Sequence, residues 1–275
     1  MESLLKIDFP PPARSAQEPI STGALRQASR QILRRPQPTP GTLQRLTLDP
    51  RGTEVRGQQA RFVAIAGNIG AGKSTLTAFL RSRFGIEPFY EPNDANPYLT
   101  DFYGDMRAYA FHSQMYFLSA KFRAHLHLAQ LLGQQPATVF VQDRTIYEDA
   151  EIFAKTLCTM GTMSARDFET YDRMYTAIRN SLPKPDLLIY LRCSLKGITN
   201  RIAHRGRPEE KAMDRKYLKA LERAYEAWFA RYDLGPTLVI ETEKLDYLSH
   251  LCDQIDLVAA LEALIGPKAP LVQGL

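Results

Sequence analysis

The sequence predicts an α/β fold with a five-stranded parallel sheet and helices on both faces. Short apolar runs alternate with long segments of helical periodicity, a pattern typical of parallel strands joined by right-handed helical crossovers. A glycine-rich turn stands between the first clear apolar run and the first long helix. With 275 residues, of which 44% are hydrophobic, the chain can bury the core of one large domain.

Residues 1–60 are predicted to be a Pro/Arg-rich disordered extension that precedes a domain formed by residues 61–275. They hold eight of the 18 prolines and show no sustained apolar period. Their nine basic and five acidic side chains supply +4 of the formal charge of +5. Because the folded domain is then almost neutral, nucleic acid is not an expected partner. A solvated tail is favoured, and a targeting peptide, a partner-docking arm or nucleic-acid binding by the arginines of the tail stays open.

Composition also narrows the cellular setting. No apolar run approaches the roughly 20 residues that a membrane-spanning helix needs, so no membrane association is expected. The cysteines Cys158, Cys193 and Cys252 lie far apart and form no C-x-x-C pair. This pattern favours reduced thiols in a cytoplasmic protein over a disulfide framework or a zinc site.

The elements follow in order from apolar runs and their breaks. Leu182-Pro-Lys-Pro185 leads into the fourth strand, and Gly133-Gln-Gln-Pro136 ends the long second helix. Strands are predicted at 61–66, 86–91, 137–143, 186–192 and 236–241. Helices are predicted at 73–84, 103–132, 147–159, 164–181, 194–205, 214–231 and 247–265. In such a sheet, ligands bind at the carboxyl ends of the strands.

The stretch FVAIAGNIGAGKSTL, residues 62–76, carries the most specific motif. A short apolar strand leads into G-x-x-x-x-G-K-S, and an apolar helical pattern follows, which is the phosphate-binding P-loop in its strand–loop–helix context. Lys73 is expected to reach the β- and γ-phosphates of ATP, and the Ser74 hydroxyl to ligate Mg²⁺. The loop and the start of its helix are expected to cradle the phosphates through Gly67, Asn68, Ile69, Gly70, Ala71, Gly72, Lys73, Ser74 and Thr75.

Polar residues end the second and third strands. Glu91 precedes Pro92, which cannot extend a sheet ladder, so its carboxylate is expected at the rim beside the P-loop. There it could take a proton from an attacking hydroxyl, or it could be a helix cap or a solvated acid. The third strand ends at Asp143-Arg144. An acid in this place usually helps to hold Mg²⁺, and the arginine supplies a fixed cation, although a structural ion pair is the alternative.

Three arginines follow the fourth strand. Arg201 and Arg205 are four residues apart near the end of a helix, Gly206 breaks that helix, and Arg207 follows. This arrangement suggests a lid that closes over phosphates and neutralises their charge. A solvated basic helix end, which the helix dipole favours, is the alternative.

Taken together, these motifs resemble the deoxynucleoside kinase family, and more closely its bacterial deoxyadenosine/deoxyguanosine kinase branch. The resemblance covers about residues 61–265. It rests on the P-loop, on Glu91-Pro92, on Tyr103 followed eleven residues later by Gln114, on D-R-T-I-Y-E-D at 143–149, and on the Arg-Gly-Arg lid. It implies a P-loop kinase fold with an arginine-rich lid, ATP with Mg²⁺ as phosphate donor, and a homodimer in which long helices pack together.

The resemblance also implies residue roles. Glu91 would be the general base for the nucleoside 5′-hydroxyl, Arg144 would contact that oxygen, and Asp143 would act on Mg²⁺. The remaining substrate contacts would come from groups that hold the sugar 3′-hydroxyl, pair with or stack on the base, or form a charged pair deep in the base pocket: Tyr103 and Glu210, Gln114 and Phe153, and Lys121 with Asp149. Lys121 replaces a more usual arginine, and Ser113 stands where an aromatic residue commonly stacks.

The sequence therefore predicts a cytoplasmic, ATP-dependent deoxynucleoside kinase for nucleotide salvage, acting on a deoxynucleoside with a purine base. A nucleoside monophosphate kinase similar to thymidylate kinase shares the P-loop, an Asp-Arg pair and an arginine lid. It would need extra cations around the acceptor phosphate, whereas Glu91, Tyr103 and Gln114 are acidic or neutral. A P-loop regulatory protein with a partner-docking tail is the alternative from another class, although a GTPase would require an N-K-x-D motif that is absent.

Overall fold

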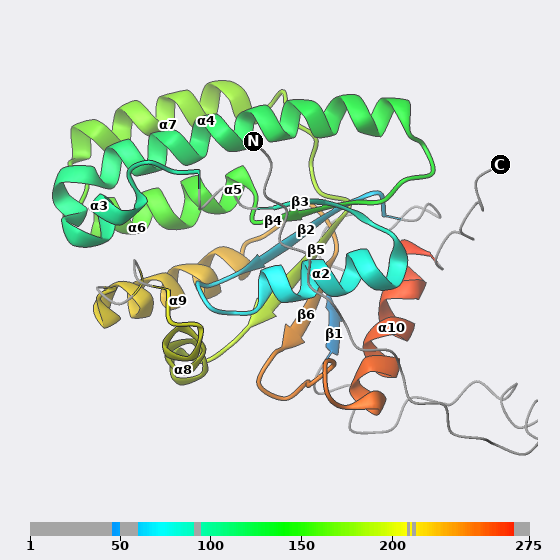
Figure 1. Ribbon diagram of the computed structural model, residues 1–275. Helices are drawn as coiled ribbons and strands as arrows, with labels where there is room; N and C mark the ends of the chain where they lie inside the picture. The colour runs from blue at the N-terminus through cyan, green and yellow to red at the C-terminus, as the bar shows by residue number, and fades with distance from the viewer. Residues whose placement is uncertain (1–45, 50–59, 91–94, 208–209, 211–212, 267–275) are drawn as a thin grey trace, which may run out of the picture. The chain divides into compact units, whose positions relative to one another are not determined.

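The computed structural model describes residues 46–49, 60–90, 95–207, 210 and 213–266 (Figure 1). The chain divides into two units, 1–39 and 40–275, and all described residues belong to the second. Most of the extension predicted at 1–60, and Glu91, lie outside the described residues.

A six-stranded sheet forms the centre of this unit, in the order β1-β6-β5-β2-β4-β3. The five predicted parallel strands are confirmed, each within a few residues of its expected bounds. They are β2 (Phe62–Gly67), β3 (Glu87–Phe89), β4 (Phe140–Asp143), β5 (Leu187–Arg192) and β6 (Thr237–Glu241). β2 lies between β4 and β5, so the P-loop leaves the sheet between two other strand ends.

The sixth strand differs from the prediction. β1 (Leu46–Asp49) comes from the stretch expected to be disordered and pairs antiparallel with β6, with Leu46 opposite Ile240 and Asp49 opposite Thr237. Four residues give too short an alternation to be recognised in sequence. Its physical role is to cover the edge of β6, whose backbone groups would otherwise be unpaired along that side.

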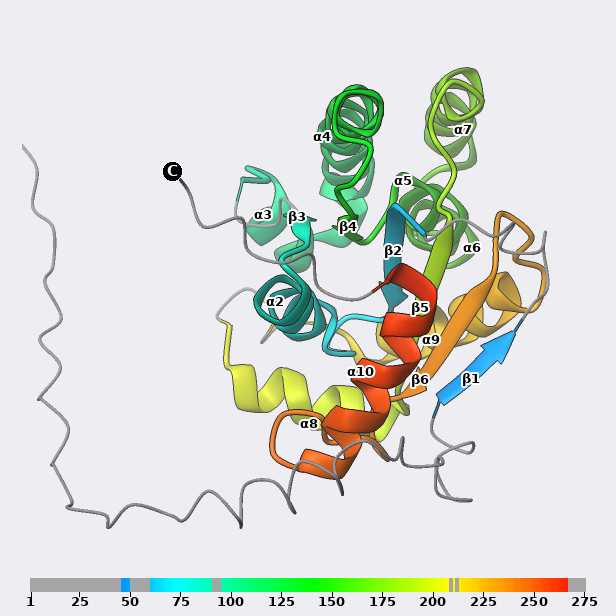
Figure 2. The same ribbon diagram turned by 90° about the vertical axis from the view of Figure 1, so that its right-hand side faces the viewer.

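The helices lie on both faces of the sheet (Figures 1 and 2). One face is covered by α2 (Lys73–Phe84) and α10 (Leu251–Ile265), and the other by α4 (Met106–Gln134), α6 (Lys155–Thr159) and α7 (Ala165–Arg179). α8 (Leu195–Arg205) lies beyond the carboxyl ends of the strands, and α9 (Arg215–Phe229) follows it along the chain. None of the helices in the described part of the chain combines the length and apolar character that crossing a membrane requires.

Two predicted helices are interrupted. The helix expected at 103–132 is split into α3 (Leu99–Gly104) and α4, because Asp105 leaves helical geometry at φ −140° and its carboxylate accepts the backbone N–H groups of Arg107 and Ala108. The helix expected at 147–159 consists of α5 (Ile146–Glu148), a π-helix η2 (Asp149–Ala154) and α6. A π-helical turn inside an α-helix is rare and frequently marks a functional site.

The core fixes the sheet edge where ligands are expected. All six residues of β2 are buried, and β5 is buried through Leu191. The same strands therefore bring the P-loop and the Asp143-Arg144 turn together at their carboxyl ends. The β6–α10 connection begins beside them, because Leu191 of β5 pairs with Ile240 of β6.

Candidate active site

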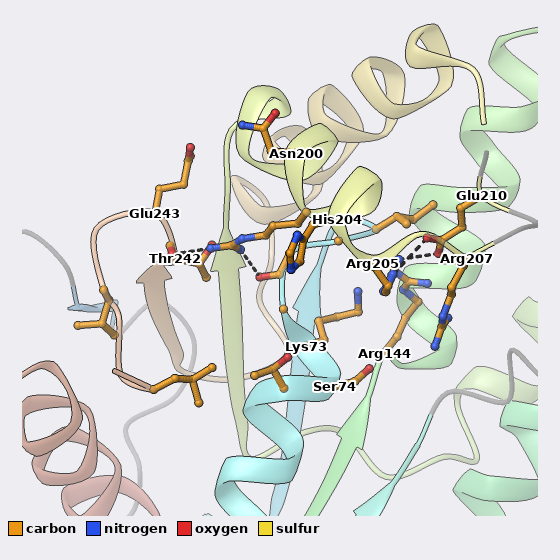
Figure 3. A pocket seen from close by; sticks show the side chains of 18 of the residues that line it. Lys73, Ser74, Arg144, Asn200, His204, Arg205, Arg207, Glu210, Thr242 and Glu243 are labelled. Atoms are coloured by element: carbon orange, nitrogen blue, oxygen red, sulfur yellow. Dashed lines mark hydrogen bonds and ion pairs between the residues drawn. The ribbon is translucent and has the colours of Figure 1, made fainter. Parts of the chain in front are cut away.

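A cavity of about 1070 Å³ opens at the carboxyl ends of the strands (Figure 3). The P-loop, α3, α4, the β4–η2 segment, α8 with the residues after it, and the β6–α10 turn all line it. Sixteen of the predicted site residues lie on its wall: Ile69, Gly70, Ala71, Gly72, Lys73, Ser74, Thr75, Tyr103, Gln114, Arg144, Asp149, Phe153, Arg201, Arg205, Arg207 and Glu210.

The P-loop has the backbone that a phosphate cradle needs. Gly67, Gly70 and Gly72 adopt positive φ values of 152°, 79° and 101°. At Gly67 a side chain is also excluded by space, since a Cβ would stand 2.9 Å from the carbonyl oxygen of Leu191. The Lys73 ammonium turns back onto the loop and donates to the carbonyl oxygens of Gly67 at 2.9 Å and Asn68 at 3.0 Å.

Ser74, at the end of the P-loop, and Asp143 form a hydrogen-bonded pair of side chains that carry oxygen atoms. The Ser74 hydroxyl donates to Oδ2 of Asp143 at 2.7 Å. Asp143 is buried, and its Oδ1 has no hydrogen-bond partner among the described residues. Mg²⁺ takes oxygen ligands and is usually held by one or two protein groups together with substrate phosphates, so this pair fits the ion. No cluster of three His, Cys, Asp or Glu side chains suited to a metal occurs in the described residues.

Arg144 is held in an unusual backbone conformation. Its φ is 61°, and among the described residues it is the one residue other than glycine with a positive φ. Its guanidinium donates to the carbonyl oxygen of Gly67 at 3.4 Å and stacks over the ring of Phe153, with 4.4 Å from the guanidinium carbon to the ring centroid. Strained backbone of this kind persists where surrounding contacts determine it, and such sites are often functional.

The sequence analysis did not single out Glu148. Its side chain is fully buried, and its carboxylate accepts the Thr145 backbone N–H at 3.0 Å and the Tyr225 hydroxyl at 2.9 Å. Burial raises the pKa of Glu148 to about 7, against the opposing effects of Arg144, Lys73 and Lys121. The T-x-x-E spacing from Thr145 predicts a capping box, which the structure contains. Nothing in the spacing places Tyr225 beside it.

Buried polar groups lie along α4 and at the start of η2. Gln114 is buried on α4, and its Oε1 has no hydrogen-bond partner among the described residues. Seven residues along the same helix, Lys121 pairs with Oδ1 of Asp149 at 2.7 Å, and both side chains are less than 5% exposed. Lys121 lines a smaller cavity of about 330 Å³ instead of the main one. Ser113 accepts a hydrogen bond from the Asn96 side-chain amide at 3.1 Å.

The three arginines predicted to form a lid all line the cavity, but they have different partners. Arg201 is anchored: its guanidinium donates to the carbonyl oxygen of Ala71 at 3.0 Å, and to the hydroxyl and carbonyl oxygens of Thr242 at 2.9 and 2.7 Å. It therefore ties the P-loop to the end of β6. Arg205 instead pairs with Glu210 through two hydrogen bonds of 3.1 and 2.5 Å, and Arg207 lies beside this pair in Figure 3.

The wall formed by the β6–α10 turn was not predicted. Thr242 and Glu243 begin it, and the latter accepts the backbone N–H of Ser194 at 2.7 Å, which fixes the turn against the start of α8. Figure 3 places both on the opposite side of the pocket from Arg207. This turn carries no motif, so only the fold identifies it as part of the site.

Comparison with known proteins agrees with this geometry. The family model for deoxynucleoside kinases matches residues 63–266. The chain is 40% identical over 189 residues to a deoxyadenosine/deoxycytidine kinase of Bacillus subtilis, an alignment that covers 68% of this chain and 85% of that protein. It is 37% identical over 201 residues to a deoxyguanosine kinase of Lactobacillus acidophilus, covering 70% and 85%.

A solved structure gives the same result for the fold. Deoxyadenosine kinase from M. mycoides, determined with dCMP and dCDP as products, superposes with a TM-score of 0.63 at 32% identity. The alignment covers 74% of this chain and 98% of that one. The alignment therefore leaves a larger share of this chain than of the M. mycoides kinase unmatched.

The Lys121–Asp149 pair yields a prediction about stability. Lys121→Met leaves the Asp149 carboxylate buried without the ammonium, so the free energy of unfolding should fall by about 3–5 kcal/mol in urea titrations. Lys121→Met with Asp149→Leu should recover most of this loss. The matched control is Arg173→Met, whose partner Glu169 is 63% exposed, with an expected change within about 0.5 kcal/mol. If Lys121→Met alone were as stable as the wild type, the buried pairing of Lys121 with Asp149 would be contradicted.

Proposed function

The chain belongs to the deoxynucleoside kinase family, and on that premise we propose that it transfers the γ-phosphoryl group of ATP to the 5′-hydroxyl of a purine deoxynucleoside in nucleotide salvage. The observation that carries this proposal is the composition of the cavity of about 1070 Å³. Its donor side is a P-loop, and its acceptor side offers Tyr103, Gln114 and Asp149.

The acceptor side favours a nucleoside over a nucleoside monophosphate. An acceptor phosphate would bring at least one further negative charge into the pocket and would need cations of its own. On the side where the acceptor would bind, Tyr103 and Gln114 are uncharged, and the Lys121 ammonium is paired with Asp149. A neutral acceptor matches these groups better than an anionic one.

The proposed catalysis is mainly positioning and charge stabilisation. Lys73 and the P-loop backbone would hold the transferred phosphates, Arg205 and Arg207 would neutralise charge from the side of α8, and Arg144 would contact the attacking oxygen. Arg201 would support this arrangement through Ala71. Glu91 would take the proton of the 5′-hydroxyl, and this role rests on its place before Pro92 in the sequence.

Ser74 and Asp143 would hold Mg²⁺. The hydroxyl oxygen of Ser74 and the buried Oδ1 of Asp143 are ligand atoms that suit the ion. When bound, the ion would neutralise the charge of the phosphates.

Substrate recognition is proposed to come from the buried polar groups. Gln114 has an acceptor oxygen without a hydrogen-bond partner among the described residues and an amide donor, which together match the edge of a nucleobase. Phe153 would stack on the base, Lys121 and Asp149 would close the end of the pocket, and Tyr103 and Glu210 would hold the sugar 3′-hydroxyl. The purine preference is supported by the names of the relatives, which include deoxyadenosine and deoxyguanosine kinases.

We also propose a homodimer and a cytoplasmic location. Leu126 of α4 and Met174 of α7 are 42% and 48% exposed, so apolar side chains are available on the long helices that would pack together. The three cysteines are free thiols, a state that the reducing cytoplasm maintains.

Phosphate transfer from labelled ATP with Mg²⁺ tests the function. The acceptors are the four deoxynucleosides, adenosine, guanosine, and the corresponding monophosphates. We expect turnover with deoxyadenosine or deoxyguanosine and little with any monophosphate, because Tyr103 and Gln114 are uncharged and the Lys121 ammonium is already paired with Asp149. Addition of EDTA should abolish transfer by removing Mg²⁺. Turnover with monophosphates alone would overturn the proposal.

The role of Glu91 gives a second test. Glu91→Gln keeps the size of the side chain but cannot accept a proton, so kcat should fall roughly 10²- to 10⁴-fold. The KM for ATP should change little, since the donor is held by the P-loop. Glu87→Gln, an exposed acid at the start of β3, is the control and should leave kcat within twofold. A near-normal kcat in Glu91→Gln would remove the residue from the mechanism.

The assembly can be measured directly. Static light scattering at micromolar protein concentration should give about twice the chain mass of 31.1 kDa. Met174→Glu, which places a charge on the exposed face of α7, should shift the mass toward that of the single chain. A monomeric wild type would contradict the homodimer.

A further inference from the structure

Gly67, the first residue of the P-loop, is a junction for several side chains. Its carbonyl oxygen accepts hydrogen bonds from the Lys73 ammonium at 2.9 Å and from the Arg144 guanidinium at 3.4 Å. Its N–H group faces the carboxylate of Glu148, 3.4 Å from Oε1. The same oxygen lies 4.0 Å from Nε of Arg144. The two polar groups of one glycine thus connect the phosphate lysine, the arginine after β4 and a buried glutamate.

Glu148 also reaches the helix that follows the lid. Tyr225 lies on α9, which begins at Arg215, and donates its hydroxyl to Oε1 of Glu148 at 2.9 Å. A second link joins α9 to the P-loop, because the Asn68 side-chain amide donates to the carbonyl oxygen of Leu218 at 3.3 Å. The position of α9 is therefore coupled to the P-loop at two points, and Glu148 stands at one of them.

We propose that Glu148 is a positioning residue for phosphoryl transfer. Its carboxylate holds the backbone N–H of Gly67, the guanidinium of Arg144 and, through Tyr225, the helix α9 in one arrangement. The inference rests on the proposed function, in which Arg144 contacts the attacking oxygen and the P-loop holds the donor.

A structural cap alone does not require this environment. Capping of α5 uses Oε2, which accepts the N–H of Thr145 at 3.0 Å, and an exposed carboxylate would serve equally well. Here the whole side chain is buried, and a buried carboxylate is costly unless charges and hydrogen bonds compensate it. The compensation comes from Arg144, Lys73 and Lys121 as cations, and from the hydroxyl of Tyr225 as donor.

The charge of Glu148 is what acts on Arg144. Arg144 sits at φ 61°, and its guanidinium is fixed from three sides by Gly67, Phe153 and Glu148. Without the carboxylate charge, the guanidinium keeps its stacking on Phe153 but loses the electrostatic contact that sets its direction. A displacement of about 1 Å at such a group can cost roughly 10²-fold in rate.

The ionisation of Glu148 gives a pH signature. The pKa raised to about 7 lies above the ordinary value of 4.5, so the folded protein binds this proton more tightly than the unfolded chain. Protein stability therefore decreases as pH rises from about 4.5 to 7, while the charge beside Arg144 appears over the upper part of that range. The groups that face the carboxylate are Arg144, Lys73, Lys121 and the hydroxyls of Tyr225 and Tyr232.

The experiment uses the full chain and three variants. Glu148→Gln removes the charge and keeps the shape, and Tyr225→Phe removes the hydroxyl alone. Tyr190→Phe is the matched control, because Tyr190 donates to Glu226 of the same helix at 3.0 Å and lines no part of the pocket. The readouts are kcat and KM with ATP and deoxyadenosine from pH 6 to 8.5, the thermal unfolding temperature, and the rate of amide hydrogen exchange in the peptide that contains the P-loop.

We expect Glu148→Gln to lower kcat roughly 10- to 100-fold with both KM values within about threefold. Its rate should also lack the rise through pH 7 that the wild type shows. Tyr225→Phe should lower kcat by a smaller factor, and both variants should speed amide exchange in the P-loop. Tyr190→Phe should change neither rate nor exchange, and at pH 8 Glu148→Gln should be no less thermally stable than this control.

The outcomes distinguish a failure of the proposed kinase function from a failure of the positioning role of Glu148. If the wild type transfers no phosphate to any nucleoside, the proposed function fails, and P-loop exchange in Glu148→Gln still decides whether Glu148 holds the loop. If the wild type is active and Glu148→Gln has a kcat within twofold of it, the inference is overturned and the function stands. Equal losses of stability in Glu148→Gln and Tyr190→Phe, with unchanged exchange and rate, also overturn it.

Discussion

The close approach of β5 to the end of β2 is the constraint on which the rest of the site depends. Gly67 pairs with Leu191, and the space beside it cannot hold a methyl group. Only glycine therefore allows β2 to turn into the P-loop at this point in the sheet. Because β2 is the central strand, that turn lies between the ends of β4 and β5, and the Asp143-Arg144 turn comes within hydrogen-bonding distance of the loop. The phosphate side of the pocket follows from this one contact between strands.

The balance of buried charges is the second constraint on the site. The described site buries the cations of Lys73, Lys121 and Arg144 and the acids Asp143, Glu148 and Asp149. Each is compensated within the protein: Lys73 by loop carbonyls, Lys121 by Asp149, and Asp143 in part by Ser74. Apolar side chains of the same volume would stabilise the fold at least as well. The presence of so many buried charges is therefore better explained by the binding of a charged donor than by stability.

A feature of the fold or the site could be predicted where it depends on residues close together in the sequence, and not where it depends on contacts between distant segments. The P-loop, the five parallel strands and the bounds of α2 and α8 follow from local periodicity and from Gly, Lys and Ser at fixed spacing. Asp105 was missed as a helix break because its capping role depends on its own φ angle, which sequence alone does not give. β1 was missed because four residues carry little periodicity, and its pairing with β6 spans almost 200 residues. Glu148 and the β6–α10 turn belong to the site only through contacts between distant segments.

Arg201 shows how two arginines at a motif spacing can have different contacts in the fold. Its spacing from Arg205 places both on one face of α8, and the sequence therefore suggests a common role. The two guanidiniums diverge because their nearest acceptors differ: Ala71 and Thr242 lie next to the first, and Glu210 next to the second. Gly206, at φ 67°, ends α8 immediately after Arg205. The helix α8 thus contains one arginine that connects the P-loop to the end of β6 and, as its last residue, one that pairs with Glu210.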